Sequence, residues 1–160
     1  DALPIFKLAI ADTPYFLYSD FELRRRGNTY TAQTLSLLRE EYREDTFYFI
    51  IGADSLYQIE QWFHPELVMK LAVLLVAGRA YHDDHQPFDR QIEYLTARYG
   101  AKIYPIRCRE MDVSSEEIRA SVSNGHSIHG FVPDAVEEYI KDHGLYGGCV
   151  KNPVLAGKGE

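Results

Sequence analysis

The sequence has 160 residues, of which 46% are hydrophobic and 26% are charged, a balance typical of a globular domain with its own core. Its net charge of −7 disfavours a broad nucleic-acid surface, and no apolar run is long enough to cross a bilayer, so we expect neither a nucleic-acid nor a membrane partner. The two cysteines, Cys108 and Cys149, form no Cys-X-X-Cys pair, which indicates neither a disulfide framework nor a zinc site and fits a cytoplasmic location.

The chain begins with a predicted helix rather than a strand. Residues 5–11 have amphipathic helical spacing, Asp12-Thr13-Pro14 ends the helix, and residues 15–21 are predicted to form a strand. A doubly wound α/β domain normally opens with its central strand and a Gly-rich turn, and neither precedes this helix in the sequence.

An arginine-rich loop leads into the next predicted helix. Residues 22–34 read ELRRRGNTYTAQT, with Gly27-Asn28 at a turn and Thr31 as the predicted N-cap. Three consecutive arginines suit an anionic ligand, but a solvent-facing turn is the favoured interpretation, because charge blocks usually face water. The sequence leaves both interpretations open.

The stretch that follows is the most informative part of the chain. Residues 47–51 are an apolar run rich in β-branched and aromatic residues, typical of a parallel strand that is buried on both faces. Gly52 ends the strand and allows a sharp turn or a close approach to a ligand. Asp54 then lies where open α/β sheets bind ligands, and its carboxylate can accept hydrogen bonds from ribose hydroxyls or simply cap the next helix.

Strands and helices continue to alternate, which predicts an α/β fold with a parallel sheet. The predicted elements are a helix at Pro65–Leu71, a strand at Ala72–Ala77, a helix at Phe88–Tyr99 and a strand at Lys102–Ile106. Arg79 follows the second strand and could meet a phosphate at the same edge of the sheet as Asp54. Trp62, the only tryptophan, is either a stacking platform for a flat ligand or part of the core.

Residues 111–123 predict a second ligand-binding element. Ser114 and Ser115 are both good N-caps, and Glu117 lies near the capping-box position. The first turn of a helix presents free N–H groups that suit a phosphate, and Arg119 could add a charge-assisted contact. An ordinary capped helix explains the same residues. A last amphipathic helix is expected at residues 133–143.

Taken in this order, the segments LAIADTPYF, ELRRRGNTYTAQTL, YFIIGADSLYQIEQW, VSSEEIR and FVPDAVEEYIKDHGLYG resemble the bacterial nicotinate-nucleotide adenylyltransferases of the nucleotidylyltransferase superfamily. The resemblance implies a Rossmann-like nucleotidylyltransferase fold, with a parallel sheet covered by helices on both faces. It implies one domain over residues 1–147, and we expect residues 148–160 to form a flexible tail.

The resemblance also implies a reaction and its binding residues. In this family ATP and nicotinate mononucleotide give deamido-NAD and pyrophosphate, as a step of NAD biosynthesis, and magnesium arrives with ATP. The residues expected to hold nicotinate mononucleotide are Tyr30, Thr31, Trp62 and Phe63. The residues expected to hold ATP are Gly52, Asp54, Arg79, Ser114, Ser115 and Arg119.

Two departures from the family pattern stand out. Glu116 occupies a position that is usually threonine, and its carboxylate is unfavourable beside a triphosphate. The family also has a His-X-Gly-His motif whose histidines stabilise the α-phosphate, and the 160 residues contain no such sequence. His126-Ser127-Ile128-His129 is no substitute, because it follows the SSEEIR helix. We therefore expect an N-terminally incomplete enzyme with no identifiable catalytic residue and no metal ligands of its own, inactive by itself.

Two other functions remain open on the sequence alone. One is an adenylyltransferase for another phosphate acceptor, such as phosphopantetheine or nicotinamide mononucleotide. The other is a nucleotide-binding fragment without catalysis, which the absence of the histidine motif favours.

Overall fold

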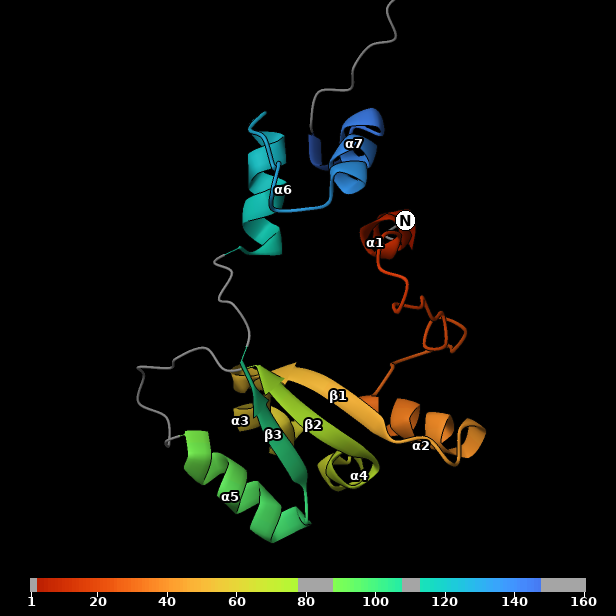
Figure 1. The fold of residues 1–160 in the computed structure, drawn as a ribbon, viewed down its shortest axis with the longest axis vertical. Coiled ribbons are helices and arrows are strands. Elements are labelled where there is room, and N and C mark those ends of the chain that lie inside the picture. The colour runs from red at the N-terminus through yellow and green to blue at the C-terminus, as the bar shows by residue number, and fades with distance from the viewer. Residues whose placement is uncertain (1–2, 78–87, 108–112, 148–160) are drawn as a thin grey trace, which may run out of the picture. The chain divides into compact units, whose positions relative to one another are not determined.

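The computed structural model describes residues 3–77, 88–107 and 113–147, which form two compact units (Figure 1). One unit lies within residues 20–110, and the other combines residues 1–19 with residues 111–160. Arg79 and the expected tail fall outside the described residues. The prediction of a single domain over residues 1–147 stays a prediction.

A three-stranded parallel sheet organises the unit of residues 20–110. Its strands are β1 (Phe47–Gly52), β2 (Ala72–Ala77) and β3 (Lys102–Ile106), in the order β1-β2-β3. The register pairs Phe47 with Ala72 and Val73 with Lys102, so the carboxyl ends of all three strands lie at one edge. The sequence prediction of three parallel strands is confirmed.

Helices precede and connect these strands. The first, α2 (Thr31–Glu41), comes before β1. The crossover from β1 to β2 contains α3 (Ala53–Gln58), the short 3-10 helix η1 (Ile59–Gln61) and α4 (Pro65–Leu71), and the crossover from β2 to β3 contains α5 (Phe88–Tyr99). Pro65 begins α4, where its missing N–H is not needed and its fixed backbone angle suits a helix. The bounds of α4, β2, α5 and β3 agree with the sequence prediction. Within the described residues, no helix is long and apolar enough to span a bilayer.

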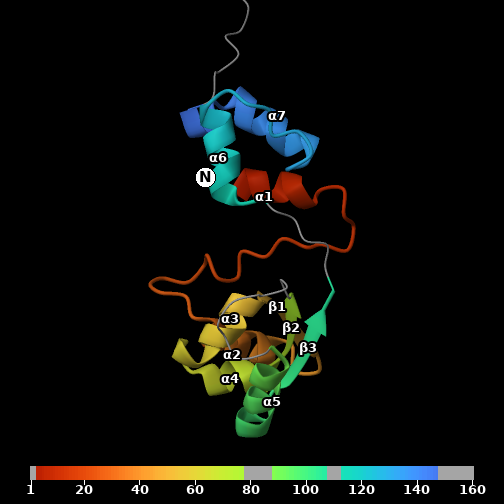
Figure 2. The ribbon, with the colours of Figure 1, turned by 90° about the vertical axis from the view of Figure 1, so that its left-hand side faces the viewer.

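The core of this unit lies on one face of the sheet, on the side where Figure 2 shows the helices. Ile51, Leu74 and Ile103 point to that face from the three strands, and all are at most 7% exposed. Leu56 of α3 and Leu95 of α5 are fully buried against them. The burial of these apolar side chains is the main stabilising contribution to the unit.

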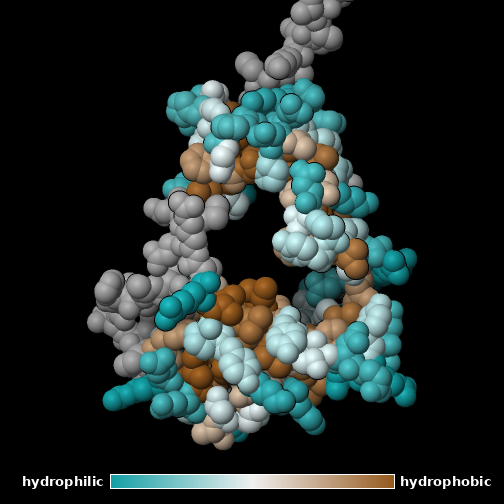
Figure 3. Space-filling model, viewed as in Figure 1, coloured by the Kyte–Doolittle hydropathy of each residue, from teal (hydrophilic) through white to brown (hydrophobic). Residues whose placement is uncertain are grey.

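The opposite face of the sheet differs from the prediction. Tyr48 and Ile50 of β1 are 62% and 65% exposed, and Tyr104 of β3 is 56% exposed. Figure 3 shows hydrophobic residues gathered over the strands of this unit. Alternate residues of a strand project to opposite sides of the sheet, so the alternating exposure along β1 means that one of its faces is uncovered. The prediction that β1 is buried on both faces is therefore wrong for the described structure, in which helices of this unit cover one face only.

The other unit joins the two ends of the described chain. It contains α1 (Leu3–Ile10), α6 (Ser115–Ser123), α7 (Asp134–Asp142) and the short 3-10 helix η2 (Leu145–Gly147). The first helix, α1, packs against α7, although more than one hundred residues separate them in sequence. Their shared core consists of Val122, Ile128, Val136 and Ile140, with Ile5, Leu8, Ile118, Val132 and Leu145 around them.

The predicted strand at residues 15–21 does not form. This segment has turns and irregular backbone in its place, and Phe16 N donates to Thr13 O at 3.0 Å in one of the turns. Tyr15 and Leu17 are 80% and 90% exposed. An apolar run becomes a strand only when a neighbour supplies ladder hydrogen bonds, and no strand in the described residues pairs with this one.

The one-sided core makes a stability prediction. Leu74 lies at the centre of β2 and is fully buried, so Leu74→Ala leaves a cavity between the sheet and its helices and should lower the free energy of unfolding by about 2–5 kcal/mol. Leu23→Ala removes the same atoms from a side chain that is 63% exposed and serves as the matched control. Urea unfolding followed by circular dichroism measures both, and equal losses would contradict the assignment of the core.

Candidate active site

The arginine-rich loop is attached to α2 by side-chain hydrogen bonds. Arg25 Nη2 donates to Gln33 Oε1 at 2.5 Å, and Arg25 Nη1 donates to Thr34 Oγ1 at 3.3 Å. Thr34 Oγ1 in turn donates to Glu22 Oε1 at 2.6 Å. Two residues of α2 thus hold both ends of residues 22–25, which gives Arg25 a structural role in this loop.

The loop delivers Tyr30 to the start of α2. Tyr30 is the N-cap, with an extended backbone and no side-chain capping bond, and Thr31 is the first helical residue. The prediction of Thr31 as the N-cap is therefore wrong by one position. The Tyr30 ring stacks on Phe63, with 4.4 Å between ring centroids and an interplanar angle of 28°. This contact brings together the two stretches expected to bind nicotinate mononucleotide.

Trp62 lies at the end of η1 and is half-buried. Its ring meets Phe49 of β1 edge to face, with 6.2 Å between centroids, and it packs at the margin of the core. Phe63, the next residue, is 42% exposed. Trp62 thus has a core contact on one side, and its partial exposure leaves room for the platform role as well.

His64 is a residue that the sequence analysis missed. Its backbone is left-handed, with φ 50° and ψ 60°, a conformation that stores strain in a residue with a side chain. Its ring meets Phe63 edge to face at 4.2 Å, and its Nδ1 lies 2.9 Å from Glu66 Oε1. That hydrogen bond lowers the pKa of the Glu66 carboxyl.

A hollow of about 360 Å³ opens beside this aromatic group. Arg25 and Gln33 line it from the loop and α2, and Phe63, His64 and Leu67 line it from the other side. His64 is marked locally by its left-handed backbone angle, which cannot be seen in a sequence. The contact between Arg25 and Gln33 was equally invisible, because it depends on how the loop folds over α2.

The carboxyl end of β1 places the candidate sugar-binding residues. Gly52 is the N-cap of α3 without a side-chain bond, and Asp54 lies exposed in the first turn. The interpretation of Asp54 as the cap itself is therefore wrong. A Cβ added to Gly52 would meet no atom within 4 Å, so the described structure does not itself require glycine there. The space above Gly52 is available to a ligand.

The start of α6 is a complete capping box. Ser114 Oγ accepts from Glu117 N at 3.1 Å, and Glu117 Oε2 accepts from Ser114 N at 2.8 Å. Ser115 is the first helical residue, so Ser114 alone is the N-cap. These hydrogen bonds from the Ser114 hydroxyl and backbone lower the pKa of the Glu117 carboxyl. Glu116 and Arg119 are both exposed nearby.

The candidate residues are thus distributed over the two units. Tyr30, Thr31, Trp62 and Phe63 form one group, and Gly52 with Asp54 forms another, all in the unit of residues 20–110. Ser114, Ser115 and Arg119 belong to the other unit. In the first group, the stacking of Tyr30 on Phe63 brings together residues that are far apart in the sequence.

Similarity to known proteins decides the family. No family model matches the chain. A probable nicotinate-nucleotide adenylyltransferase of Lachnoclostridium phytofermentans is 46% identical over 142 residues, which cover 89% of this chain and 70% of the relative. The chain belongs to the nicotinate-nucleotide adenylyltransferase family. Probable nicotinate-nucleotide adenylyltransferases of Caldicellulosiruptor bescii and a Synechococcus species are 37% and 38% identical, each over 91% of this chain and over 72% and 69% of their own lengths.

Solved structures agree on the fold of this nicotinate-nucleotide adenylyltransferase family member. Two structures of Plasmodium falciparum nicotinic acid mononucleotide adenylyltransferase, complexed with APC and with NaAD, match with TM-scores of 0.69 and 0.68. They cover 93% of this chain and 76% and 74% of theirs, at 20% and 19% identity. The predicted Rossmann-like fold with a parallel sheet is confirmed.

The capping box makes stability depend on pH. Because the folded state lowers the Glu117 pKa from its ordinary 4.5, its stabilisation is fully present above that pH and is lost as the pH falls through the folded-state pKa. Glu117→Gln keeps the cap geometry without the charge. Its melting temperature should therefore lie below that of the wild type at pH 7, and the two should converge in acid. Glu116→Gln, which removes the same charge one residue earlier, is the control, and an equal response would contradict the capping role.

Proposed function

We propose that this protein transfers the adenylyl group of ATP to nicotinate mononucleotide, releasing deamido-NAD and pyrophosphate in NAD biosynthesis. The observation that carries the proposal is the 46% identity to the Lachnoclostridium phytofermentans relative over nearly the whole chain. We place the reaction in the cytoplasm, where cysteines are normally kept reduced.

The chemistry needs no nucleophile from the protein. A phosphate oxygen of nicotinate mononucleotide forms a bond to the α-phosphorus of ATP, and the bond from that phosphorus to the bridging oxygen breaks. Pyrophosphate leaves with the bonding electrons, and magnesium enters as part of the MgATP substrate. Catalysis then consists of orienting the two substrates and neutralising developing charge.

The acceptor is proposed to bind beside the aromatic group of the unit of residues 20–110. Trp62 stacks on the nicotinate ring, Tyr30 and Thr31 flank it, and the backbone at Phe63 holds the carboxylate. The stacked rings of Tyr30 and Phe63 support this arrangement, because they fix the two stretches against each other before a ligand arrives.

ATP-binding residues are proposed in each unit separately, at the carboxyl end of the sheet in one and at the start of α6 in the other. Asp54 accepts hydrogen bonds from the ribose, and the open space above Gly52 supports a close approach of the nucleotide. Arg79, Ser114, Ser115 and Arg119 contact the phosphates. The Ser114 hydroxyl already accepts from Glu117 N, so a phosphate there shares the helix terminus with the Glu117 carboxylate.

Two other functions are distinguished from the proposed one by measurements of binding and turnover. Another phosphate acceptor would replace nicotinate mononucleotide, and a binding fragment would hold both substrates without turnover. Nicotinamide mononucleotide is the sharpest competitor, since it lacks only the carboxylate charge.

Pyrophosphate release tests the proposed reaction. The 160 residues contain no His-X-Gly-His sequence, so with MgATP and nicotinate mononucleotide they should turn over far below about 1 per second. A chimera that adds the part of the Lachnoclostridium phytofermentans relative that this chain does not match should turn over at an enzymatic rate, and faster with nicotinate than with nicotinamide mononucleotide. A chimera that binds both substrates without turnover would contradict the proposal. Fast turnover by the 160 residues alone would contradict the role given to the histidines.

Two variants separate the substrate sites. In the same chimera, Trp62→Ala should weaken nicotinate mononucleotide binding by roughly 0.5–1.5 kcal/mol, or about 2- to 13-fold, and leave MgATP binding nearly unchanged. Arg119→Ala should weaken MgATP binding by about tenfold or more, because a charge-assisted hydrogen bond is lost. Calorimetry with each substrate makes each variant the control for the other. Equal losses for both substrates in Trp62→Ala would assign the ring to the core.

A further inference from the structure

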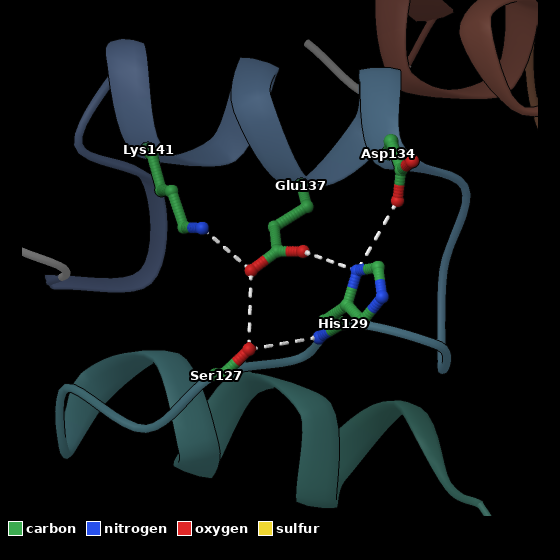
Figure 4. Close-up of polar contacts among 5 residues, drawn as sticks. All are labelled: Ser127, His129, Asp134, Glu137 and Lys141. Carbon is green, nitrogen blue, oxygen red and sulfur yellow. Dashed lines mark hydrogen bonds and ion pairs between the residues drawn. The ribbon is translucent and has the colours of Figure 1, made fainter.

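The loop after α6 and the first turns of α7 bring three potential metal ligands together, none of which is a residue proposed to hold a substrate. His129 Nδ1 and one carboxylate oxygen each from Asp134 and Glu137 all lie within 4.8 Å of one another (Figure 4). Asp134 and Glu137 are three residues apart on α7, so they share a face of the helix.

Glu137 is buried and already oriented. Its side chain is 7% exposed, and its Oε1 accepts from Lys141 Nζ at 2.5 Å and from Ser127 Oγ at 3.4 Å. Its Oε2 faces His129 Nδ1 at 3.8 Å. One oxygen of the carboxylate is therefore held by protein donors while the other points into the cluster, which is how partners around a metal site orient its ligands.

His129 is fixed by the turn that carries it. Its backbone N donates to Ser127 Oγ at 3.1 Å, and Phe131 N donates to Ile128 O at 3.0 Å across Gly130, whose φ of 82° suits glycine. Ile128 is 1% exposed and anchors the turn in the core of this unit. The imidazole therefore approaches α7 from a defined position, with Nδ1 3.3 Å from Asp134 Oδ1.

We propose that His129, Asp134 and Glu137 bind one divalent transition-metal ion, of which Zn²⁺ is the best fit. Tetrahedral Zn²⁺ with bonds of about 2.0–2.2 Å sets its ligand atoms about 3.3–3.6 Å apart. The separations of 3.3 Å and 3.8 Å from His129 Nδ1 are close to that spacing. Asp134 is 80% exposed and can adjust its rotamer, and water completes the coordination.

Charge supports a cation at this position. With His129 neutral, two carboxylates face one ammonium group, that of Lys141, and leave one net negative charge. An imidazole nitrogen with two carboxylates suits Zn²⁺ better than Mg²⁺, which prefers oxygen ligands and retains its waters. The ion ties the loop after α6 to the first turns of α7 and thereby stabilises this unit.

Zinc titration by calorimetry, with the 160-residue chain in magnesium-free buffer, tests the site. The wild type should bind one more equivalent of Zn²⁺ than His129→Ala, or bind that equivalent more than about 100-fold tighter. Such a difference exceeds the loss of metal affinity usually caused by removing a residue that only hydrogen-bonds to a metal ligand. His126→Ala is the matched control, because it removes an exposed histidine from the same loop and leaves the cluster intact. His129 is 75% exposed, so its replacement should not prevent folding.

Thermal unfolding gives a second readout that depends on where the ion binds. Excess Zn²⁺ should raise the melting temperature of the wild type and of His126→Ala more than that of His129→Ala or Asp134→Asn. Equal zinc stoichiometry and equal thermal shifts in all four proteins would overturn the proposal and leave the cluster as a network of ion pairs. These measurements involve neither ATP nor nicotinate mononucleotide, so their failure is distinct from failure of the proposed reaction.

Discussion

The parallel register of β1, β2 and β3 is the constraint on which the unit of residues 20–110 depends. It aligns the inward side chains of the three strands, so one apolar layer can hold four helices against a single face. The same register brings the carboxyl ends of the strands to one edge, where Asp54 comes two residues after Gly52. The sheet therefore places candidate binding groups as a by-product of packing its core.

Much of this fold could be predicted from the sequence because its signals are local. Ala72–Ala77 is a short apolar run that follows a helix begun by proline, and such runs mark buried strands. The strand predicted at residues 15–21 failed because an apolar run does not reveal whether a partner exists. The packing of α1 against α7 was also invisible, since no local pattern links residues so distant in the chain.

The candidate site likewise contains features that local sequence predicts and features that depend on tertiary structure. Asp54 and the Ser114 capping box were predictable, because strand ends and helix caps depend on a few neighbouring residues. The stacking of Tyr30 on Phe63 depends on tertiary structure. The grouping of His129 with Asp134 and Glu137 also depends on tertiary structure, because the position of the histidine in the sequence does not show that it meets these two carboxylates of α7.

Trp62 gives the molecule a built-in optical reporter. The sequence contains a single tryptophan, whose ring contacts Phe49 at the margin of the core. Its emission therefore reports on the unit of residues 20–110, to which Trp62 belongs. Fluorescence can follow the melting of one unit, while the helical ellipticity of the whole chain follows both.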